Sequence, residues 1–234
     1  MIIIPARMAS NRFPNKILAN INGFPMVIAT AKRVEGLDKV VIATDSQKLI
    51  NLAYDYGFDT IMTGDHHQSG TDRINEAATK LDIHEDEIIV NVQADEPFIE
   101  PEVVQSVINR VKSSNCFMAS CYKLIGKEFA NDPNHVKVIT DVNENAIYFS
   151  RSKIPFEREE HLEYFGHLGI YGFTKKSLKE FCELSPAPLE NIEKLEQLRA
   201  IYHGKKIAMV RVESESFGID TKDDLEKALA YFKT

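Results

Sequence analysis

After Met1 the chain reads Ile2-Ile3-Ile4-Pro5-Ala6-Arg7-Met8-Ala9-Ser10-Asn11-Arg12-Phe13-Pro14-Asn15-Lys16. A short unbroken apolar run such as Ile2 to Ile4 is typical of a strand that is buried on both faces. Open parallel α/β sheets bind ligands at the carboxyl ends of their strands, which is where this polar segment begins. Arg7, Arg12 and Lys16 make the segment cationic, so it predicts an anion site, with phosphate as the best fit. A solvated surface loop is the alternative interpretation.

Composition sets the broad class of protein. A chain of 234 residues can form one sizeable α/β core, or a core domain with a smaller insertion. Its 44% hydrophobic and 27% charged residues are typical of a globular protein and exclude a disordered chain. The net charge of −7 gives no broad electrostatic footprint for nucleic acid, so we expect no nucleic acid partner.

The cysteines and the apolar runs bear on the compartment. Cys116, Cys121 and Cys182 give an odd count without CxxC spacing, which favours buried thiols over disulfides or a zinc site. No run approaches the roughly 18 apolar residues of a membrane span, and the amino terminus has no signal-peptide pattern. We therefore expect a cytoplasmic protein without a membrane span.

Strand and helix patterns alternate in the first hundred residues. Apolar runs predict strands at 39–44, 60–62 and 88–92, after the first strand. Helical spacing predicts helices at 25–34, from 45 or 46 to 57, and from 74 to about 81, with 64–73 as a polar loop. This alternation favours an α/β fold built on a doubly wound, mostly parallel sheet.

The pattern changes after a helix predicted at 101–112. Strand-like runs at 118–122, 136–140, 146–149 and 168–173 favour a mixed-sheet region, with a hairpin turn at 143–145. Helices are predicted after residue 174 and from about 190 to 202, the second with Ile192, Leu195, Leu198 and Ile201 buried. A late strand at 207–212 precedes a final helix, which Thr221 and Asp224 cap as a capping box.

Asp95 and Asp220 each follow a predicted strand, so both are expected near the cationic loop. Magnesium usually takes one or two carboxylates and shares phosphate oxygens with its substrate, so two aspartates are enough. Together with the facing cations they indicate phosphoryl or nucleotidyl transfer. The alternatives are that Asp220 only helps cap the last helix and that Asp95 only anchors a turn.

The glycines and histidines exclude rival sites. No Gly-x-Gly-x-x-Gly follows the first strand, and no Gly-x4-Gly-Lys-Ser/Thr occurs. The chain therefore does not hold a nucleotide as dinucleotide dehydrogenases or P-loop kinases do. His66 and His67 have no metal-ligand spacing to another His or Cys and are interpreted as solvated loop residues.

An ordered series of motifs covers nearly the whole chain. It consists of Ile3-Ile4-Pro5-Ala6-Arg7 with Ser10, Arg12, Pro14 and Lys16; Ile42-Ala43-Thr44-Asp45; His67-Gln68-Ser69-Gly70-Thr71-Asp72-Arg73; Asn91-Val92-Gln93-Ala94-Asp95-Glu96-Pro97; Val136-Lys137-Val138; Tyr148-Phe149-Ser150-Arg151; His167-Leu168-Gly169-Ile170-Tyr171; Leu189-Glu190-Asn191-Ile192-Glu193; Leu195-Glu196-Gln197-Leu198-Arg199; and Gly218-Ile219-Asp220-Thr221. In this series the chain resembles the 3-deoxy-manno-octulosonate cytidylyltransferase (CMP-Kdo synthetase) family. It departs from that family at Asn15 and Ala94, where Gly is usual.

The resemblance implies an activity and an organisation. The activity is the joining of CTP and 3-deoxy-D-manno-octulosonate (Kdo) to give CMP-Kdo and pyrophosphate for lipopolysaccharide biosynthesis, with Mg²⁺ as cofactor. The organisation is a nucleotide-diphospho-sugar transferase-like fold: a single nucleotidyltransferase domain over 1–234, with an inserted dimerisation segment at roughly 123–175. A cytoplasmic homodimer is expected.

The resemblance also assigns roles to residues. The catalytic group is Lys16, Asp95 and Asp220, and the two aspartates hold the metal. The nucleotide side consists of Pro5, Ala6, Arg7, Ser10, Arg12, Lys16, Ser69, Arg73 and Gln93; Arg12 and Lys16 hold the triphosphate, and Ser69 and Arg73 lie near cytosine. The sugar side consists of Gln93, Arg151, His167, Tyr171, Glu196 and Gln197, with Arg151 on the sugar carboxylate.

Alternatives stay open at this point. The acceptor could be another acidic sugar, such as 8-amino-Kdo or a neuraminate, because the methyl of Ala94 narrows the space beside the ligand. The chain could also be a regulator that binds nucleotide without turnover. His167 and Tyr171 could be core residues, and Arg151 could pair with Glu157 or Glu159 at the surface.

Overall fold

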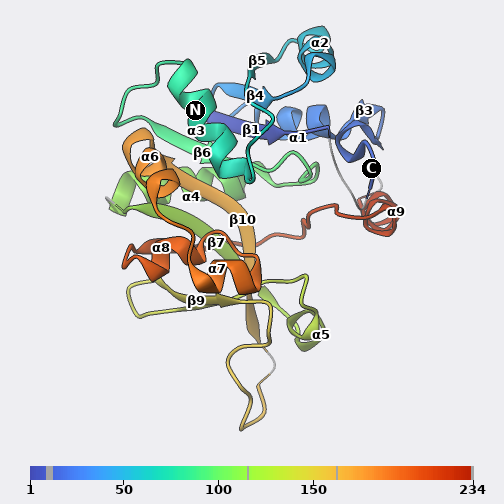
Figure 1. The fold of residues 1–234 in the computed structure, drawn as a ribbon. Coiled ribbons are helices and arrows are strands. Elements are labelled where there is room, and N and C mark those ends of the chain that lie inside the picture. Colours follow the sequence, from blue (N-terminus) through green and yellow to red (C-terminus); the bar gives the residue numbers. More distant parts are fainter. Residues whose placement is uncertain (9–12, 115, 162, 233–234) are drawn as a thin grey trace.

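The computed structural model describes residues 1–8, 13–114, 116–161 and 163–232 (Figure 1). Within these residues nine strands form one sheet, whose main path runs β11-β7-β10-β6-β1-β4-β5. Four neighbouring strands are parallel: β1 (Ile2–Ala6), β4 (Val40–Thr44), β5 (Asp59–Met62) and β6 (Ile88–Asn91). The apolar runs of the first hundred residues are therefore strands of one parallel sheet, as predicted.

The other half of the sheet is mixed. β7 (Met118–Ile125) and β11 (Ile207–Arg211) are parallel to each other, and β10 (Tyr164–Thr174) lies antiparallel between β6 and β7. β8 (Lys137–Thr140) and β9 (Ala146–Ser150) form the predicted hairpin and join the sheet through β10. Separately, β2 (Asn20–Ile21) and β3 (Phe24–Pro25) form a two-stranded sheet. The mixed region of the prediction is confirmed.

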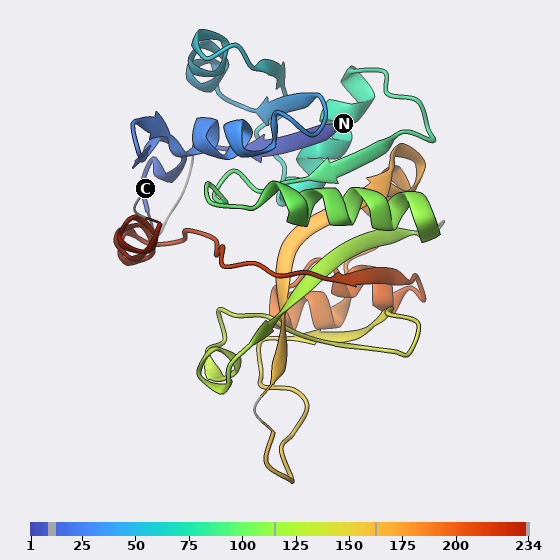
Figure 2. The same cartoon turned by 180° about the vertical axis from the view of Figure 1, so that it is seen from behind.

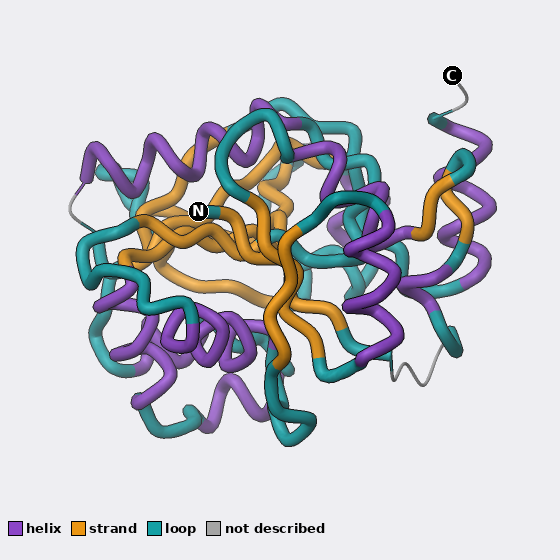
Figure 3. The backbone as a smooth tube through the Cα atoms, turned by 90° about the horizontal axis from the view of Figure 1, so that it is seen from above, coloured by secondary structure: helices purple, strands orange, loops and turns teal. Residues whose placement is uncertain are grey.

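Helices cover both faces of the sheet (Figure 3). One face packs against α1 (Met26–Val34), α2 (Gln47–Asp55) and α4 (Pro101–Ser114), and the other against α3 (Gly70–Lys80), α6 (Lys175–Glu183) and α8 (Leu198–Tyr202). The side chains of a strand alternate between faces, so Ile2 and Ile4 join the first core and Ile3 the second. The sheet is therefore doubly wound, as predicted.

The chain's last segment returns to its amino-terminal half. From β11 an irregular segment crosses the molecule to α9 (Lys222–Tyr231), which lies beside β3 (Figures 1 and 2). Phe98 and Phe232 stack there with ring centroids 4.4 Å apart. The capping box of Thr221 and Asp224 is present as predicted. This return brings Asp220 to the sheet edge that follows β1 and β6.

One predicted helix is two. The segment expected to be helical from about 190 to 202 forms α7 (Pro188–Glu193) and α8, separated at Lys194, whose backbone is left-handed with φ 53°. The break rotates the two halves relative to each other. Leu195 and Leu198 are buried as predicted, but Ile192 is 76% exposed, so its predicted burial was wrong.

The predicted polar loop at 64–73 is shorter than expected. Helix α3 begins at Gly70, and the Ser69 side chain accepts a hydrogen bond from the Asp72 backbone N–H. Asp72 in the first turn suits the positive end of the helix dipole. A single turn carries too little apolar periodicity to be read as helix, which explains the error.

Other predictions have mixed outcomes. The three cysteines are free thiols, with Cys121 fully buried and Cys116 and Cys182 partly buried. A short helix, α5 (Lys127–Asn131), was not predicted. The proposed dimerisation segment at roughly 123–175 stays a prediction, although its last part belongs to β10 in the central sheet. Across the described residues no helix has the length and apolar character to cross a bilayer.

Candidate active site

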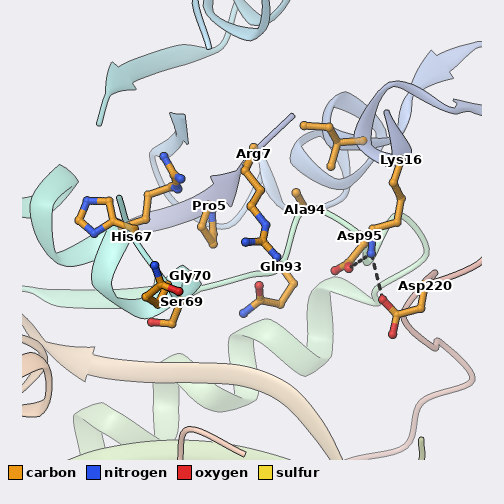
Figure 4. Close-up of a pocket in the computed structure, with 14 residues that line it drawn as sticks. Pro5, Arg7, Lys16, His67, Ser69, Gly70, Gln93, Ala94, Asp95 and Asp220 are labelled. Atoms are coloured by element: carbon orange, nitrogen blue, oxygen red, sulfur yellow. Dashed lines mark hydrogen bonds and ion pairs between the residues drawn. The ribbon is translucent and has the colours of Figure 1, made fainter. Parts of the chain in front are cut away.

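A cavity of about 490 Å³ opens at the carboxyl ends of β1 and β6. Figure 4 shows its lining, which combines the loop after β1, the start of α3, the loop after β6 and Asp220. The predicted residues found there are Pro5, Ala6, Arg7, Lys16, Ser69, Arg73, Gln93, Asp95 and Asp220. Two further predicted residues, Ser10 and Arg12, lie outside the described residues. The structure therefore gathers every described residue of the predicted nucleotide side.

Lys16 joins the two aspartates. Its Nζ lies 2.5 Å from Asp95 Oδ2 and 3.1 Å from Asp220 Oδ1, although 204 positions separate Lys16 from Asp220 (Figure 4). Burial lowers the pKa of Lys16, but the attraction of the two carboxylates outweighs that effect and raises its pKa overall. The ammonium is thus charged at neutral pH.

Asn15 places Lys16 on this cluster. Lys16 begins a short 3₁₀ helix, Lys16–Leu18, and Asn15 before it has φ 56°. Asn tolerates this left-handed backbone better than most residues, which explains how the chain keeps the turn without the glycine that is usual in the resembled family.

The same cluster fits a divalent cation. The Lys16 ammonium marks a place where two carboxylates already hold a positive charge. Among the described residues, no group of three or more His, Cys, Asp or Glu side chains is arranged to hold a metal ion. Two carboxylates suit magnesium, which takes its remaining ligands from water and phosphate, better than they suit zinc.

The start of α3 closes the cavity opposite Lys16. A Cβ at Gly70 would lie 3.0 Å from Pro5 Cγ and 3.3 Å from Gln93 Oε1. Glycine therefore lets the helix approach the loops after β1 and β6 closely. The resulting wall presents Ser69 and the positive end of α3 to the cavity, an arrangement suited to a polar ligand.

Arg73 is held firmly by the protein. Its guanidinium donates to Thr63 Oγ1 at 2.6 Å and to Asp45 Oδ2 at 2.7 Å, and its side chain is only 3% exposed. It lines the cavity but already has protein partners. Arg73 is therefore a rigid part of the predicted cytosine side.

The interpretation of His67 as a solvated residue was wrong. Its side chain is about 10% exposed, forms a hydrogen bond with the Glu76 carboxylate and lines the cavity, whereas His66 is exposed as predicted. Glu76 lies on α3, three residues after Arg73, so only the tertiary structure brings it to His67. The other lining residues that sequence reasoning did not assign to a site are Ile17, Gln68, Gly70 and Ala94. Ala94 lines this cavity and not the second one, so it belongs to the nucleotide side, and it is also part of the hydrophobic core.

A second cavity, of about 450 Å³, adjoins the first. Its lining includes four residues of the predicted sugar side, His167, Tyr171, Glu196 and Gln197. Asp220 lines both cavities, so the cluster around Lys16 lies where they meet. Two ligands bound in the two cavities would face each other across this cluster.

Two polar groups of the second cavity, His167 and Tyr171, are uncharged at neutral pH. Burial lowers the pKa of His167 to about 3 and raises the pKa of Tyr171 well above its ordinary value. The Tyr171 hydroxyl donates to Gln197 Oε1 at 3.1 Å. Such neutral donors and acceptors suit the hydroxyl groups of a sugar.

Glu196 has one carboxylate oxygen engaged and one without a protein partner. Thr71 Oγ1 donates to Oε1 at 2.6 Å, whereas the buried Oε2 has no hydrogen-bond partner among the described residues. Burial raises the pKa of this carboxyl. Thr71 belongs to α3, so this hydrogen bond connects the helix that closes the first cavity with the wall of the second.

Arg151 lies apart from the predicted sugar side. It lines neither cavity, and its guanidinium donates to the backbone carbonyls of Glu193, Pro133 and Lys194. In the part of the chain that the structure describes, the surface pairing with Glu157 or Glu159 is not found either; Glu157 pairs with Lys127 and Lys153. The basic residues that do line the second cavity are Lys123, His135 and Lys194. No motif in the sequence marked these three.

Glu96 is an acidic residue in the wall of the second cavity. It follows Asp95 and lines the second cavity, and its buried Oε2 has no hydrogen-bond partner within the described ranges. Burial and the neighbouring Asp95 raise the pKa of Glu96 to about 8, although Lys123 opposes the shift. Its carboxyl therefore keeps a proton around neutral pH in the ligand-free protein.

Comparison with known proteins gives a consistent result. Residues 1–207 match the family described as cytidylyltransferase. A 3-deoxy-manno-octulosonate cytidylyltransferase of a Nitratiruptor species is 56% identical, with 99% of each chain covered. The proteins of the same name from Wolinella succinogenes and Helicobacter acinonychis are 50% and 48% identical and are covered over 99% and 98% of their lengths; the matches take in 99% and 100% of this chain.

Solved structures agree with the sequence relatives. A CMP:2-keto-3-deoxy-manno-octonic acid synthetase complexed with CTP superposes with a TM-score of 0.91 at 36% identity, covering 98% of this chain and 96% of that one. A putative glucose-1-phosphate thymidylyltransferase from Bacillus anthracis superposes with a TM-score of 0.67 at 15% identity, covering 98% and 94%. The second likeness concerns the fold alone.

Proposed function

The chain belongs to the cytidylyltransferase family, and from this premise we propose that it transfers the cytidylyl group of CTP to the anomeric hydroxyl of Kdo, giving CMP-Kdo and pyrophosphate. One structural observation carries the proposal: the cluster of Lys16, Asp95 and Asp220 lies where a nucleotide-sized cavity meets a second cavity whose polar lining includes His167, Tyr171 and Gln197. An anionic donor and a polyhydroxylated acceptor can therefore meet at that cluster.

The reaction needs alignment more than a covalent nucleophile. The anomeric oxygen attacks the α-phosphorus in line, the bond from that phosphorus to the bridging oxygen breaks, the hydroxyl proton is released, and pyrophosphate leaves. With CTP in the first cavity and Kdo in the second, the α-phosphate lies near Asp220, which lines both. Charge develops on phosphate oxygens, so fixed positive groups at this point lower the barrier.

Lys16 and Arg7 would supply protein-borne positive charge. The pKa of Lys16 is raised, so its ammonium stays charged at neutral pH. Arg7 is exposed and points into the cavity toward Gln93 in Figure 4, where a triphosphate can reach it. Arg12 is proposed for the same role from the family resemblance.

We propose magnesium as the cofactor, held by Asp95 and Asp220. Their carboxylates are the donor type magnesium prefers, and their present partner is a cation. When bound, the ion would neutralise phosphate charge. The two carboxylates would keep their orientation toward the junction, while the Lys16 ammonium would move to triphosphate oxygens.

The sugar side is proposed from the second cavity. His167, Tyr171, Glu196 and Gln197 would bind the hydroxyl groups of Kdo. The sugar carboxylate needs a cation: Arg151 is proposed from the family resemblance, and its guanidinium would have to leave three backbone carbonyls to reach the ligand.

The deciding experiment compares pyrophosphate release from CTP, UTP and ATP with Kdo as acceptor in magnesium buffer. The same assay with 8-amino-Kdo and a neuraminate, each with CTP, separates the acceptor classes. We expect release with CTP and Kdo to exceed every other pair. Faster pyrophosphate release with another acidic sugar would show that this sugar, and not Kdo, is the acceptor. No release with any pair would support a nucleotide-binding regulator instead.

We further propose that the enzyme is a cytoplasmic homodimer that supplies lipopolysaccharide synthesis. Several apolar side chains of the segment 123–175 are exposed, notably Val142 at 96% and Phe156 at 85%. Burial in an interface would remove them from water. Sedimentation of wild type and Phe156→Glu tests this: a wild-type monomer would contradict the dimer, and a Phe156→Glu dimer would place the contact elsewhere.

A further inference from the structure

Ser120 is a fully buried serine behind the second cavity, which is the acceptor cavity of the proposed function. It lies in β7 opposite Tyr171 of β10, beside the point where the β10 register shifts between Leu168 and Tyr171. Its Oγ lies 2.7 Å from Ile170 O, 3.3 Å from Leu168 O and 2.9 Å from His167 Nε2. Ser120 lines neither cavity, so it does not contact a ligand directly.

These distances fix the position of the hydroxyl hydrogen. A serine hydroxyl has one hydrogen, and a backbone carbonyl can only accept. The short contact to Ile170 O therefore takes the Ser120 hydrogen. The Ser120 oxygen can then only accept from His167, so Nε2 of the imidazole must carry a hydrogen.

The other ring nitrogen follows from the charge state. With its pKa lowered to about 3, His167 is neutral at pH 7, so its Nδ1 has a lone pair and no hydrogen. Gln197 Nε2 lies 3.5 Å from that nitrogen and donates to it, although at this length the bond is weak. Gln197 Oε1 then faces Tyr171 and accepts its hydroxyl hydrogen at 3.1 Å.

The four hydrogen bonds then form one directed chain, in which each group donates to the next. The chain runs from Tyr171 through Gln197, His167 and Ser120 to Ile170 O. The Tyr171 hydrogen is used within the protein, so the Tyr171 oxygen can offer only lone pairs to a ligand. The second N–H of Gln197 remains as a donor. The Tyr171 oxygen can therefore accept a hydrogen bond from a sugar hydroxyl, whereas it repels an anionic oxygen of a ligand.

We propose that Ser120 is a positioning residue that fixes the Nε2–H tautomer of His167, and through it the hydrogen-bonding direction of Gln197 and Tyr171 in the acceptor cavity. The consequence for catalysis rests on the proposed function, because it assumes that the sugar binds there. The tautomer itself does not depend on that assumption. A serine that only satisfied the irregular carbonyls of β10 would not control which nitrogen is protonated.

The direct test is ¹⁵N NMR of histidine-labelled protein without ligand. His167→Gln identifies the His167 signals among the seven histidines. We expect wild type to show Nε2 protonated and Nδ1 unprotonated. Ser120→Ala removes the hydroxyl that accepts from Nε2–H, so we expect the Nδ1–H tautomer to become populated. Protonated Nδ1 in wild type, or an unchanged tautomer in Ser120→Ala, would overturn the proposal.

Kinetics test the consequence for the sugar. Ser120→Ala should raise KM for Kdo about tenfold, as expected for one disturbed hydrogen bond, with KM for CTP changed less than about twofold. Ser120→Thr keeps the hydroxyl in a residue that strands favour and should restore the wild-type KM for Kdo. Ser106→Ala in α4, which removes another hydroxyl that donates to a backbone carbonyl, is the matched control.

The outcomes are distinguishable. Equal rises in both KM values, or Ser120→Thr behaving as Ser120→Ala with the melting temperature retained, would mean that the Ser120 hydroxyl does not position the sugar-binding groups. If wild type does not use Kdo, the proposed function fails while the NMR result still decides the tautomer. If wild type uses Kdo and Ser120→Ala keeps both KM values, only the inference about Ser120 fails.

Discussion

Lys16 shows how one residue can depend on the whole chain. Its ammonium is held by an aspartate 79 positions away and by another 204 positions away. An isolated Lys–Asp pair at a surface contributes little to stability. Two carboxylates around one ammonium at the junction of two cavities therefore support the proposed phosphate and metal site more than a purely structural ion pair.

The first prediction at this scale concerns Asp95. Asp95→Asn keeps the shape of the side chain but removes a charge that Lys16 and the proposed magnesium ion would share, so pyrophosphate release should fall by about 10²-fold or more. The melting temperature should stay near that of wild type because Lys16 keeps Asp220 as a partner. Asp86→Asn, at an exposed position, is the control. Wild-type turnover in magnesium would remove Asp95 from the metal site.

The second prediction concerns Arg73. Arg73→Ala should weaken CTP binding, measured by calorimetry, far more than it raises KM for the sugar, because Arg73 lines only the first cavity. It should also lower the free energy of unfolding by about 3 kcal/mol, since Asp45 loses its buried partner. An unchanged CTP affinity in the folded variant would contradict the nucleotide-side assignment.

At the scale of elements, the segment between β11 and α9 decides where Asp220 lies. It has no regular structure, and side chains take the place of a strand partner for its backbone. Glu100 accepts from the backbone N–H of Glu215 at 2.9 Å, and Lys123 donates to the carbonyl of Ser216 at 2.8 Å. These contacts hold the segment on the sheet, so Asp220 arrives opposite Lys16.

The break between α7 and α8 gives the third prediction. Lys194 has φ 53°, a conformation that costs an L-residue roughly 1 kcal/mol and glycine little. Lys194→Gly should therefore raise the melting temperature by about 2–4 °C. Lys179→Gly, at an exposed position inside α6, should lower it by a similar amount. A loss of stability in Lys194→Gly would show that the lysine side chain outweighs the backbone strain.

At the scale of the whole molecule, two hydrophobic cores and the sheet between them hold polar groups away from water. His167 illustrates the consequence, because its pKa falls to about 3 in the folded state. Between pH 6.5 and 3 the unfolded chain takes up a proton there that the folded protein does not. Folding is therefore increasingly disfavoured as pH falls through this range, and the contribution vanishes above pH 6.5.

The fourth prediction follows from this direction of the pH dependence of stability. Between pH 6.5 and 5 His167 should contribute a loss of stability as pH falls, with a slope of up to about 1.4 kcal/mol per pH unit, and the raised pKa of Glu96 opposes this loss equally in both proteins. In His167→Gln that part of the slope should disappear. Urea unfolding of both proteins at half-unit steps of pH measures the difference. Parallel stability curves would mean that His167 titrates normally in the folded protein.

The sequence by itself determined the parallel half of the sheet and much of the candidate site. Buried strands and amphipathic helices follow from local apolar spacing. Residues of a short motif such as Gln93-Ala94-Asp95 are close in space because they are adjacent in the sequence. Carboxyl ends of parallel strands share one edge, so the approach of Asp95 to the loop after β1 was predictable. The left-handed turn at Asn15 was also foreseeable from its residue type.

Only the tertiary structure decided the rest, because those features depend on contacts between distant segments. It placed β10 antiparallel between β6 and β7, broke the predicted helix at Lys194 and turned Ile192 outward. It also attached Arg151 to backbone carbonyls outside both cavities and joined Ser120 to His167. The burial of a side chain and the direction of its hydrogen bonds depend on the residues that pack against it. The apolar periodicity of one segment carries no information about those residues.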